Sequence, residues 1–553
     1  MTRSRSPLRD ESYGSLRQRL AGSRRDQPEI SFDLRAPALP FAMPTPLPPP
    51  DVCERALDAR DPRFDGIFFV GVTTAMVYCR PTCPSRVSHS DRRRFFDSAA
   101  AAERGGFRPC LRCRPELAPG RAPMDAVPRL ARIAADRIGA GALNGQSVGQ
   151  LARELGVSAR HLRRSMESEI GVSPLELAQT HRLLLAKRLL ADTSLSVTRV
   201  AYASGFKSLR RFNASFREQY RLAPSAIRRA ARTWTGTKLP LGDDAPLNLT
   251  LSYRAPYAWD ALLSFLRSDA MDGVEIVDGR LYGRTIHVAG CNGFIVVEDA
   301  SLGSVGRSLA DASRPLARGS ANYLNVAVSQ SLVPVFMPLL ARLRQLLDLD
   351  ANPALIDTHL AQAGLGALVA RRPGVRIPGT IDGFEVALRA ILRGHARTGH
   401  GMSLRDPARR VVWELGEPLE TGIPALSRLT PTPERVADAG SARLEALGIP
   451  RSRATAAVEV ARLVADGTLR LEPGSDAAET RGALTEIPGV GDRVATTIVM
   501  RALSWPDALS ITDGALQRAA GVSTARELSA HSERWRPWRA YAAMHLWLER
   551  EAR

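Results

Sequence analysis

Four of the six cysteines of this 553-residue chain lie in two close pairs. Three residues separate Cys79 from Cys83, two separate Cys110 from Cys113, and a segment of helical pattern lies between the pairs. Two short loops that each supply two thiolates are typical of a closed tetrahedral zinc site. The spacing therefore predicts one Zn²⁺ held by four sulfurs, which would contribute directly to the folding of so small a module. Four unrelated thiols are the less favoured interpretation.

Arginines surround these cysteines, namely Arg80, Arg86, Arg92, Arg93, Arg94, Arg108, Arg112 and Arg114. A purely structural metal site gives no reason for them. The motifs "DPRFDGIFFVGVTT", "YCRPTCPSR" and "RFFDSAAAAERGGFRPCLRCRP" resemble the N-terminal domain of Ada-type methyl-phosphotriester sensors. The resemblance implies that Cys79 accepts a methyl group, that the other three cysteines are ligands only, and that Arg80 and Arg86 contact DNA. The chain departs from the family at Ala75 and Met76, which replace a small polar residue and a glycine beside the acceptor.

The implied chemistry is a single methyl transfer. Zinc keeps a thiol deprotonated at neutral pH, and the thiolate is the nucleophile. A methylated phosphate is a neutral triester, so it does not repel an anionic sulfur as an ordinary diester would. Transfer to Cys79 would remove one of the two negative charges of a tetrathiolate zinc centre, and affinity for the DNA backbone would rise. The thioether product is stable, so the reaction would run once per molecule.

Two helix-turn-helix patterns follow the cysteine module. The first is "SVGQLARELGVSARHLRRSMESEIGVSP", at 147–174, where Ser147 and Gln150 fit a capping box that opens the first helix. A second helix is expected after Ser158. The arginines that this second helix is expected to expose to DNA are Arg160, Arg163 and Arg164.

The second pattern is "SVTRVAYASGFKSLRRFNASFREQYRLAPSAIRR", with a recognition helix expected near 208–217. Leu209, Phe212 and Phe216 fall on its inward face at helical spacing. The residues expected to meet DNA are Ser208, Arg210, Arg211 and Asn213. The whole stretch resembles an AraC-type DNA-binding domain, in which such helices enter the major groove. The alternative is a small helical bundle with a solvated charged face.

The loop "IPGVGD" in the C-terminal half is typical of the hairpin in a helix-hairpin-helix motif. Gly489 and Gly491 let the backbone approach closely, and the amides that open the next helix can hold a DNA phosphate. Asp513 follows in "SITDGAL", a context that fits a helix N-cap. Locally, therefore, Asp513 has a structural interpretation that needs no catalysis.

Residues from about 247 to 553 resemble AlkA-type DNA-3-methyladenine glycosylases, through "LSYRAPYAWDALLSFL", "PGVRIPGTIDGFEVALRAIL", "LTEIPGVGDRVATTIVMRAL", "ALSITDGALQRAAGV" and "ERWRPWRAYAAMHLWL". The resemblance implies that Asp513 is the catalytic carboxylate. It would stabilise positive charge that develops on the sugar of a flipped base and help water attack. Trp547 is implied to stack on the base, with core packing as the competing role. No lysine stands where a Schiff base would form, so strand incision is not expected.

The chain departs from the glycosylase family around the implied base pocket. Arg493 and Thr497 stand where family members commonly have Trp and Tyr. The stretch "RGHARTGHG" (393–401) replaces the family's segment beside the DNA wedge. Arg493 would repel a cationic base that entered the pocket, so altered specificity or loss of base release are both open.

Composition agrees with a nucleic-acid partner. The formal net charge is +19 and comes mostly from arginine, which suits phosphate contacts, although an Arg-rich codon preference is the bland alternative. The chain has no run of 18 apolar residues to cross a membrane and no secretory signal pattern. We therefore expect a cytoplasmic, nucleoid-associated bacterial protein that is monomeric. Its expected partners are double-stranded DNA, both alkylated and at promoter sites, and RNA polymerase as a candidate.

The expected fold is multidomain and mainly α, with α+β parts. The expected segments are a disordered Pro/Arg-rich tail (1–50), an Ada-type zinc methyl-acceptor domain (51–120), an AraC-type helix-turn-helix domain (124–232), an AlkA-type N-terminal α+β subdomain (247–331) and an all-α helix-hairpin-helix glycosylase domain (332–553). Three functions are compatible with this order. The favoured one joins methyl transfer, promoter binding and base excision. The second is a methylation-activated regulator whose glycosylase-like domain only binds DNA, and the third is a glycosylase with a purely structural zinc module.

Overall fold

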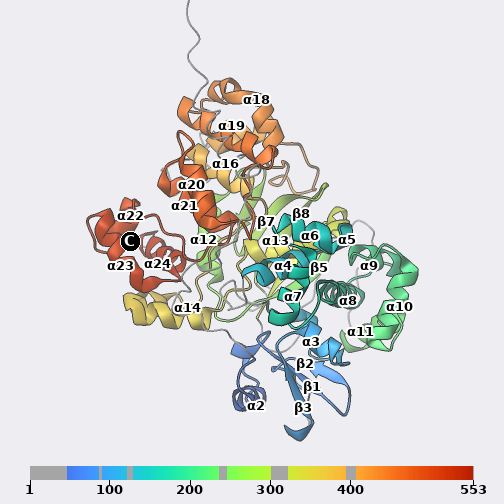
Figure 1. Cartoon of the computed structure of the whole chain (residues 1–553). Coiled ribbons are helices and arrows are strands. Elements are labelled where there is room, and N and C mark those ends of the chain that lie inside the picture. Colours follow the sequence, from blue (N-terminus) through green and yellow to red (C-terminus); the bar gives the residue numbers. More distant parts are fainter. Residues whose placement is uncertain are drawn as a thin grey trace, which may run out of the picture.

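The computed structural model describes residues 47–85, 90–120, 129–235, 246–299, 322–393 and 407–551. The chain is mainly helical with two small sheets, as the sequence predicts (Figure 1). Most of the expected tail, Arg86 and residues 394–401 of the altered wedge segment lie outside the described residues. Among the helices in the described ranges, none combines the length and apolar character needed to span a bilayer.

The cysteine module is built on a four-stranded sheet in the order β3-β1-β2-β4. Its strands are β1 (Phe69–Val72), β2 (Val77–Cys79), β3 (Arg93–Phe96) and β4 (Arg108–Pro109), and its helices are α2 (Pro50–Asp58) and α3 (Ala99–Arg104). β2 and β4 are adjacent and parallel. Cys79 ends β2 and Cys110 directly follows β4, so both cysteine-bearing loops leave the sheet at the same end.

Eight helices follow the cysteine module. They are α4 (Arg129–Gly139), α5 (Ala142–Gly145), α6 (Val148–Glu154), α7 (Ala159–Glu169), α8 (Pro174–Asp192), α9 (Val197–Ala203), α10 (Leu209–Tyr220) and α11 (Pro224–Thr235). Ser147 and Gln150 form the predicted capping box: the Ser147 Oγ accepts from the Gln150 amide at 3.2 Å, and the Gln150 Oε1 accepts from the Ser147 amide at 2.7 Å. The two predicted helix-turn-helix units are therefore α6–α7 and α9–α10, joined by the long helix α8.

A five-stranded antiparallel sheet in the order β5-β9-β8-β7-β6 follows the helix-turn-helix region. Its strands are β5 (Leu247–Ser252), β6 (Glu275–Asp278), β7 (Leu281–Val288), β8 (Cys291–Asp299) and β9 (Tyr323–Val328). The alternating patterns in 247–256 and 280–299 predict β5, β7 and β8. The prediction did not include β6 or β9, although Leu324, Val326 and Val328 of β9 alternate with Tyr323, Asn325 and Ala327 and are buried on one face of the strand.

The rest of the described chain is helical. Its helices are α12 (Trp259–Asp269), η5 (Gln330–Val335), α13 (Phe336–Leu346), α14 (Pro353–Leu360), η6 (Ala361–Leu365), α15 (Gly366–Arg371), α16 (Gly383–Arg393), α17 (Pro407–Leu415), α18 (Pro433–Ala446), α19 (Arg451–Ala465), α20 (Ala477–Thr485), α21 (Asp492–Ala502), α22 (Gly514–Ala519), α23 (Ala525–Ser532), η7 (Glu533–Trp535) and α24 (Arg539–Glu551). α16 to α21 pack around one apolar core and α14, α15 and α22 to α24 around another. The pocket described below lies where α21, α22 and α24 meet.

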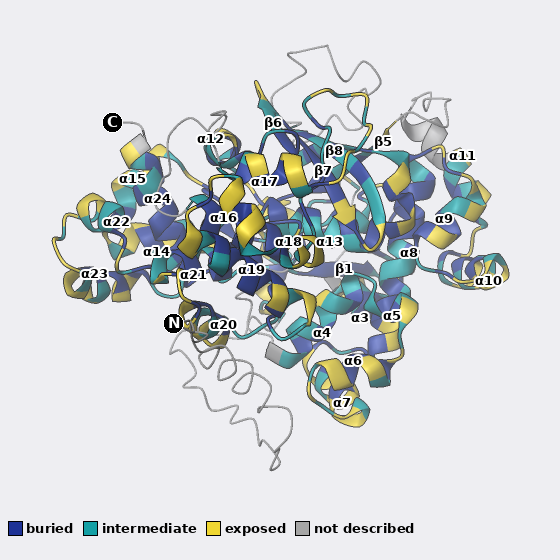
Figure 2. Cartoon of the chain, turned by 90° about the horizontal axis from the view of Figure 1, so that it is seen from above, coloured by how far each residue is buried: buried dark blue, intermediate teal, exposed yellow. Residues whose placement is uncertain are grey.

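The second helix-turn-helix unit and the five-stranded sheet share a single apolar core. That core joins Leu189 of α8 and Phe212 of α10 to Leu249 of β5 and Val326 of β9. Arg199 of α9 also donates to Gln330 of η5 at 2.9 Å. In Figure 2 the interior between α9 and the sheet is buried, while α7 and α10 lie at the periphery with exposed outer faces. The second predicted helix-turn-helix unit is thus packed directly against the five-stranded sheet.

Buried charges join this sheet to the helices beyond it. Arg284 of β7 pairs with Glu385 of α16 at 2.6 Å. Arg389 of α16 reaches Glu275 of β6 at 2.8 Å, and both side chains are almost fully buried. Buried ions without partners would be strongly destabilising, so the network fixes how the helices sit on the sheet.

Candidate zinc centre, DNA-binding helices and base pocket

The four sulfurs of the cysteine module come together as the spacing predicts. The Sγ atoms of Cys79, Cys83, Cys110 and Cys113 all lie within 4.8 Å of one another, and all four residues are buried. The backbone amide of Arg80 donates to the Cys113 sulfur at 3.4 Å. The Arg112 amide likewise donates to the Cys110 sulfur at 3.4 Å. Four converging sulfurs, two of them facing backbone donors, form a donor set suited to a soft, tetrahedral cation such as Zn²⁺.

Arg80 does not extend toward solvent. Its side chain is 7% exposed and forms an ion pair with Asp65, with Nε and Oδ1 2.8 Å apart. Its Nη1 lies 3.2 Å from the hydroxyl oxygen of Tyr323 on β9. The prediction that Arg80 contacts DNA is therefore corrected: a guanidinium held inside the protein between a carboxylate and the second sheet has no face left for a phosphate.

The turn before Cys79 carries backbone strain. Met76 adopts φ of +48°, in the left-handed region that glycine tolerates and a side chain does not favour. This conformation accounts for the glycine that the family has beside the acceptor. The Met76 side chain is 43% exposed, so it lies beside the buried Cys79 without being absorbed into the core.

The cysteine module rests on α8 through buried polar contacts. Lys187 of α8 donates to the Cys110 carbonyl at 3.2 Å and pairs with Glu116 at 2.5 Å. Glu103 of α3 accepts from Thr180 of α8 at 2.7 Å and from the Tyr78 hydroxyl at 3.0 Å. Burial raises the pKa of Glu103 to about 7, although these two hydrogen bonds oppose the shift. A carboxyl that titrates near neutrality thus lies between the metal-binding module and α8.

The predicted recognition helices present their polar residues as expected. On α7, Arg160, Arg163 and Arg164 are exposed, whereas Leu162 and Met166 are buried. On α10, Phe212 and Phe216 are buried and Leu209 is half-buried against the same core, as the helical spacing predicts. The residues of this unit predicted to meet DNA are all exposed or half-buried: Ser208, Arg210, Arg211 and Asn213. The Ser208 hydroxyl also caps α10 by accepting from the Arg211 amide at 3.4 Å, so it is partly committed within the protein.

The helix-hairpin-helix pattern is formed by α20, the turn at 486–491 and α21. Gly489 has φ of +96°, and a Cβ there would lie 2.7 Å from the Ser452 carbonyl. Gly491 is the N-cap of α21, and a Cβ there would meet nothing within 4 Å. Burial alone would raise the pKa of Asp492, but hydrogen bonds from Arg481 and Ser510 bring it below its usual value. The Asp492 side chain is therefore bound within the protein at the start of α21, and the space beside Gly491 stays open.

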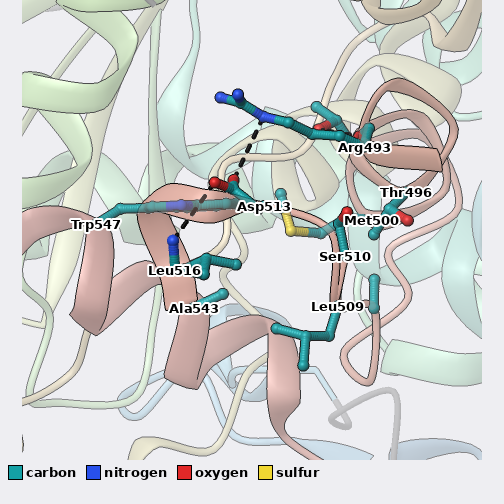
Figure 3. Close-up of a pocket in the computed structure, with 11 residues that line it drawn as sticks. Arg493, Thr496, Met500, Leu509, Ser510, Asp513, Leu516, Ala543 and Trp547 are labelled. Carbon is teal, nitrogen blue, oxygen red and sulfur yellow. Dashed lines mark hydrogen bonds and ion pairs between the residues drawn. The ribbon is translucent and has the colours of Figure 1, made fainter. Parts of the chain in front are cut away.

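Asp513 meets both interpretations of its sequence. Its Oδ1 accepts from the amides of Ala515 at 2.8 Å and Leu516 at 3.4 Å, which makes it the N-cap of α22. Its Oδ2 accepts no hydrogen bond within the described part of the chain, although Asp513 is only 2% exposed. This second oxygen faces a pocket that includes Trp547 (Figure 3). A buried carboxylate with one committed and one available oxygen can stabilise a developing positive charge.

Arg493 reaches into the same pocket. Its Nε lies 3.3 Å from Asp513 Oδ2, in an ion pair that is not aligned as a hydrogen bond (Figure 3). Thr497 also lines this pocket, and its hydroxyl donates to the Arg493 carbonyl at 2.9 Å, one turn back along α21. The hydroxyl of Thr496 lines the pocket, is buried, and has no partner among the described residues. Sequence reasoning singled out Arg493 but missed its pairing with Asp513, and no local signal marked Thr496.

Comparison with known protein families finds three matches along the chain. The family described as "Metal binding domain of Ada" matches residues 52–116, a "Helix-turn-helix domain" family matches 151–230, and the "AlkA N-terminal domain" family matches 248–382. A relative from Mycobacterium tuberculosis, named "Probable bifunctional transcriptional activator/DNA repair enzyme AlkA", is 36% identical over 505 residues, which cover 90% of this chain and 95% of the relative.

The chain belongs to this AlkA-type family of bifunctional activator and repair proteins. Two further relatives each match part of the chain. The "DNA-3-methyladenine glycosylase 2" of Escherichia coli is 31% identical over 301 residues, covering 54% of this chain and 96% of that protein. The "Bifunctional transcriptional activator/DNA repair enzyme Ada" of E. coli is 31% identical over 149 residues, covering 27% of this chain and 40% of that protein. The resemblance to a fusion of Ada-type, AraC-type and AlkA-type parts is thereby confirmed.

Proposed function

We propose that this protein repairs alkylated DNA and regulates transcription in response to it. The observation that carries the repair function is the Asp513 carboxylate, which is buried, capped on one oxygen and open to a pocket on the other. The pocket lies beside a helix-hairpin-helix turn whose open Gly491 side can receive a phosphate. DNA is therefore the proposed partner of both halves, while RNA polymerase contact and a monomeric state stay predictions.

Base release would follow from this pocket in one hydrolytic step. A nucleotide flipped out of the duplex would place its sugar against Asp513 Oδ2 and its base between Trp547 and the walls of the pocket. As the glycosidic bond breaks, the carboxylate stabilises the positive charge on the sugar, and water attacks the sugar carbon. No lysine lines the pocket, so a covalent Schiff base with strand incision has no nucleophile there.

The sensing function would belong to Cys79. Cys79, Cys83, Cys110 and Cys113 would hold one Zn²⁺ as a tetrathiolate. Zinc, when bound, keeps thiols deprotonated at neutral pH. The Cys79 sulfur would attack the methyl carbon of a DNA methyl-phosphotriester, forming a C–S bond while the C–O bond breaks and the phosphate oxygen keeps the electron pair. The centre then carries one negative charge less, and α7 and α10 would hold promoter DNA more tightly.

A second candidate function is that of a methylation-activated regulator whose glycosylase-like domain only binds DNA. One observation favours it. Arg493 already pairs with Asp513, and a regulator that only binds DNA would have no need for a free carboxylate there.

The test is release of free base from randomly methylated duplex DNA by the full-length protein and its Asp513→Asn variant. Release by the intact protein that disappears in the variant supports the glycosylase. Unchanged DNA binding with no release by the intact protein would leave the regulator alone. In parallel, mass analysis should find one added methyl group on the Cys79 peptide after incubation with phosphotriester DNA, and none on the Cys83 peptide.

A further inference from the structure

The base pocket holds a positive charge, and a positive charge repels a cationic alkylated base. The guanidinium of Arg493 lies against Asp513 Oδ2, and its side chain is 26% exposed while that of Asp513 is 1% exposed. Arg493 therefore stands at the mouth of the pocket and Asp513 on its floor. The remaining lining is neutral and mostly apolar, including Met500, Leu509 and Leu516. In so apolar a setting the charge of the guanidinium is poorly screened.

A fixed positive charge at this place acts against one class of substrate. A base methylated on a ring nitrogen carries a positive charge, and it must pass beside Arg493 before its sugar reaches Asp513. The same guanidinium also neutralises part of the carboxylate charge that would attract such a base. Because Arg493 is in the first turn of α21, the positive end of the helix dipole adds to the repulsion.

A neutral damaged base presents the opposite electrostatic problem. When its glycosidic bond breaks, the electron pair moves to the ring nitrogen and the base departs with negative charge. A glycosylase acting on such a base needs a donor or cation near the leaving base. Arg493 supplies both, since its guanidinium offers several N–H groups in a planar fork that matches the acceptor edge of a purine.

Resting on the proposed glycosylase function, we infer that Arg493 makes this pocket selective for neutral alkylated purines and stabilises the leaving base. Binding of the nucleotide would part Arg493 from Asp513, so that the carboxylate faces the sugar and the guanidinium faces the base. Parting them gives up the ion pair at 3.3 Å, so contacts of the carboxylate with the sugar and of the guanidinium with the base would have to replace it. The unpartnered Thr496 hydroxyl, 5% exposed in the same pocket, is a second donor for the acceptor edge.

The atoms of the reaction balance without a further reagent. The bond between sugar C1′ and the purine nitrogen breaks, and its electron pair stays on the base. The oxygen of water forms the new bond to C1′ while Asp513 Oδ2 accepts the water proton. The purine anion, held by Arg493, takes a proton from solvent as it leaves, and Asp513 returns its own to solvent. The products are the free base and an abasic site.

The experiment compares two duplexes of one sequence, which carry ethenoadenine (a neutral alkylation adduct) or 7-methylguanine (a cationic base) at one position. Base release is measured under single-turnover conditions with the full-length protein and its Arg493→Gln and Arg493→Lys variants. Asp513→Asn gives the uncatalysed background. Arg526→Gln is the matched control, because Arg526 on α23 is an exposed arginine outside the pocket lining. The melting temperature of each variant reports whether it folds.

The intact protein is expected to release ethenoadenine faster than 7-methylguanine. Arg493→Gln should lower ethenoadenine release by about 100-fold, the usual effect of removing one such donor. The same change should raise 7-methylguanine release by about tenfold, because the repulsion is gone. Arg493→Lys should still exclude 7-methylguanine, since it retains the positive charge. It should release ethenoadenine much more slowly than the intact protein, since it lacks the planar fork.

Two other results would overturn the inference in distinguishable ways. If the intact protein prefers 7-methylguanine and Arg493→Gln changes both rates by the same factor, Arg493 has no part in selectivity although the glycosylase stands. If the intact, folded protein releases neither base above the Asp513→Asn background, the glycosylase function fails and the inference falls with it.

Discussion

Arg114 and Asp192 form a two-point ion pair between the cysteine module and the last residue of α8. Arg114 Nη1 and Nη2 lie 2.6 and 2.8 Å from the two carboxylate oxygens of Asp192. The Asp192 side chain is 1% exposed and that of Arg114 is 20% exposed. Because Arg114 directly follows the cysteine Cys113, this pair ties the metal-binding loop to the helix that joins the two helix-turn-helix units.

Removing one partner of this pair should be costly. Asp192→Asn is expected to lower the free energy of unfolding by about 3 kcal/mol, because it removes a buried charge that pairs with both Arg114 and Arg188 and leaves Arg114 with Glu116 as its remaining carboxylate partner. Denaturant titration of the full chain measures the change. The control is Asp51→Asn, which breaks an exposed pair with Arg55 and should change stability by less than about 0.5 kcal/mol. Equal losses in the two variants would mean that the buried pair contributes nothing special.

Glu103 should make stability depend on pH near neutrality. Its pKa is about 7 in the folded protein, above the ordinary 4.5, mainly because of burial. Between these values the folded state holds a proton that the unfolded state has released, so stability falls as pH rises through this window. Glu103→Gln should abolish that fall and be more stable than the native protein above about pH 7. Melting temperatures measured on both sides of this pH test it, and parallel pH profiles would contradict it.

Substitutions of the two hairpin glycines should have different effects, one on stability and the other on DNA binding. Gly489→Ala should destabilise the protein by roughly 1–3 kcal/mol, because φ is +96° and the new methyl group would meet the Ser452 carbonyl. Gly491→Ala should leave the melting temperature nearly unchanged, since its Cβ position is open and its φ is −81°. Its affinity for undamaged duplex DNA, measured by fluorescence anisotropy, should nevertheless fall, because the methyl group occupies the place proposed for a phosphate. Full affinity in Gly491→Ala would remove this hairpin from the DNA interface.

Loss of metal should unfold the cysteine module selectively. Cys83→Ser should abolish zinc binding and methyl transfer, because it removes one of the four sulfurs. The module should then unfold, because the small apolar clusters around the sulfurs depend on the ion. The helices α16 to α24 should persist, since they have cores of their own. Metal analysis and circular dichroism measure both effects. Cys291→Ser is the control, as Cys291 lies on β8 outside the sulfur cluster, and its protein should retain one zinc ion per chain.

Local patterns predicted the elements that hold the sites. The cysteine spacing, the Ser147–Gln150 capping box and the helical spacing of Phe212 and Phe216 each depend on residues a few positions apart, and the structure confirms these arrangements. Asp513 as an N-cap is equally local, and Oδ1 makes the predicted bonds.

Contacts between distant segments could not be predicted in this way. Arg80 is adjacent to Cys79 in a motif that implies DNA contact, yet its guanidinium pairs with Asp65 and also donates to Tyr323, which is 243 residues away. The pairing of Arg493 with Asp513 likewise requires α21 and α22 to meet, and nothing in either helix's own pattern encodes that. Sequence reasoning therefore singled out both arginines, but it assigned Arg80 to DNA and gave Arg493 no partner within the protein.

The apolar core common to α8–α11 and the five-stranded sheet has a consequence for how such a chain evolves. Leu189 and Phe212 lie in the same core as Leu249 and Val326. A substitution that loosens this core lowers the abundance of the whole molecule in the cell, since unfolded chains are degraded. A substitution in this shared core therefore changes the amount of both halves at once, whichever half carries it.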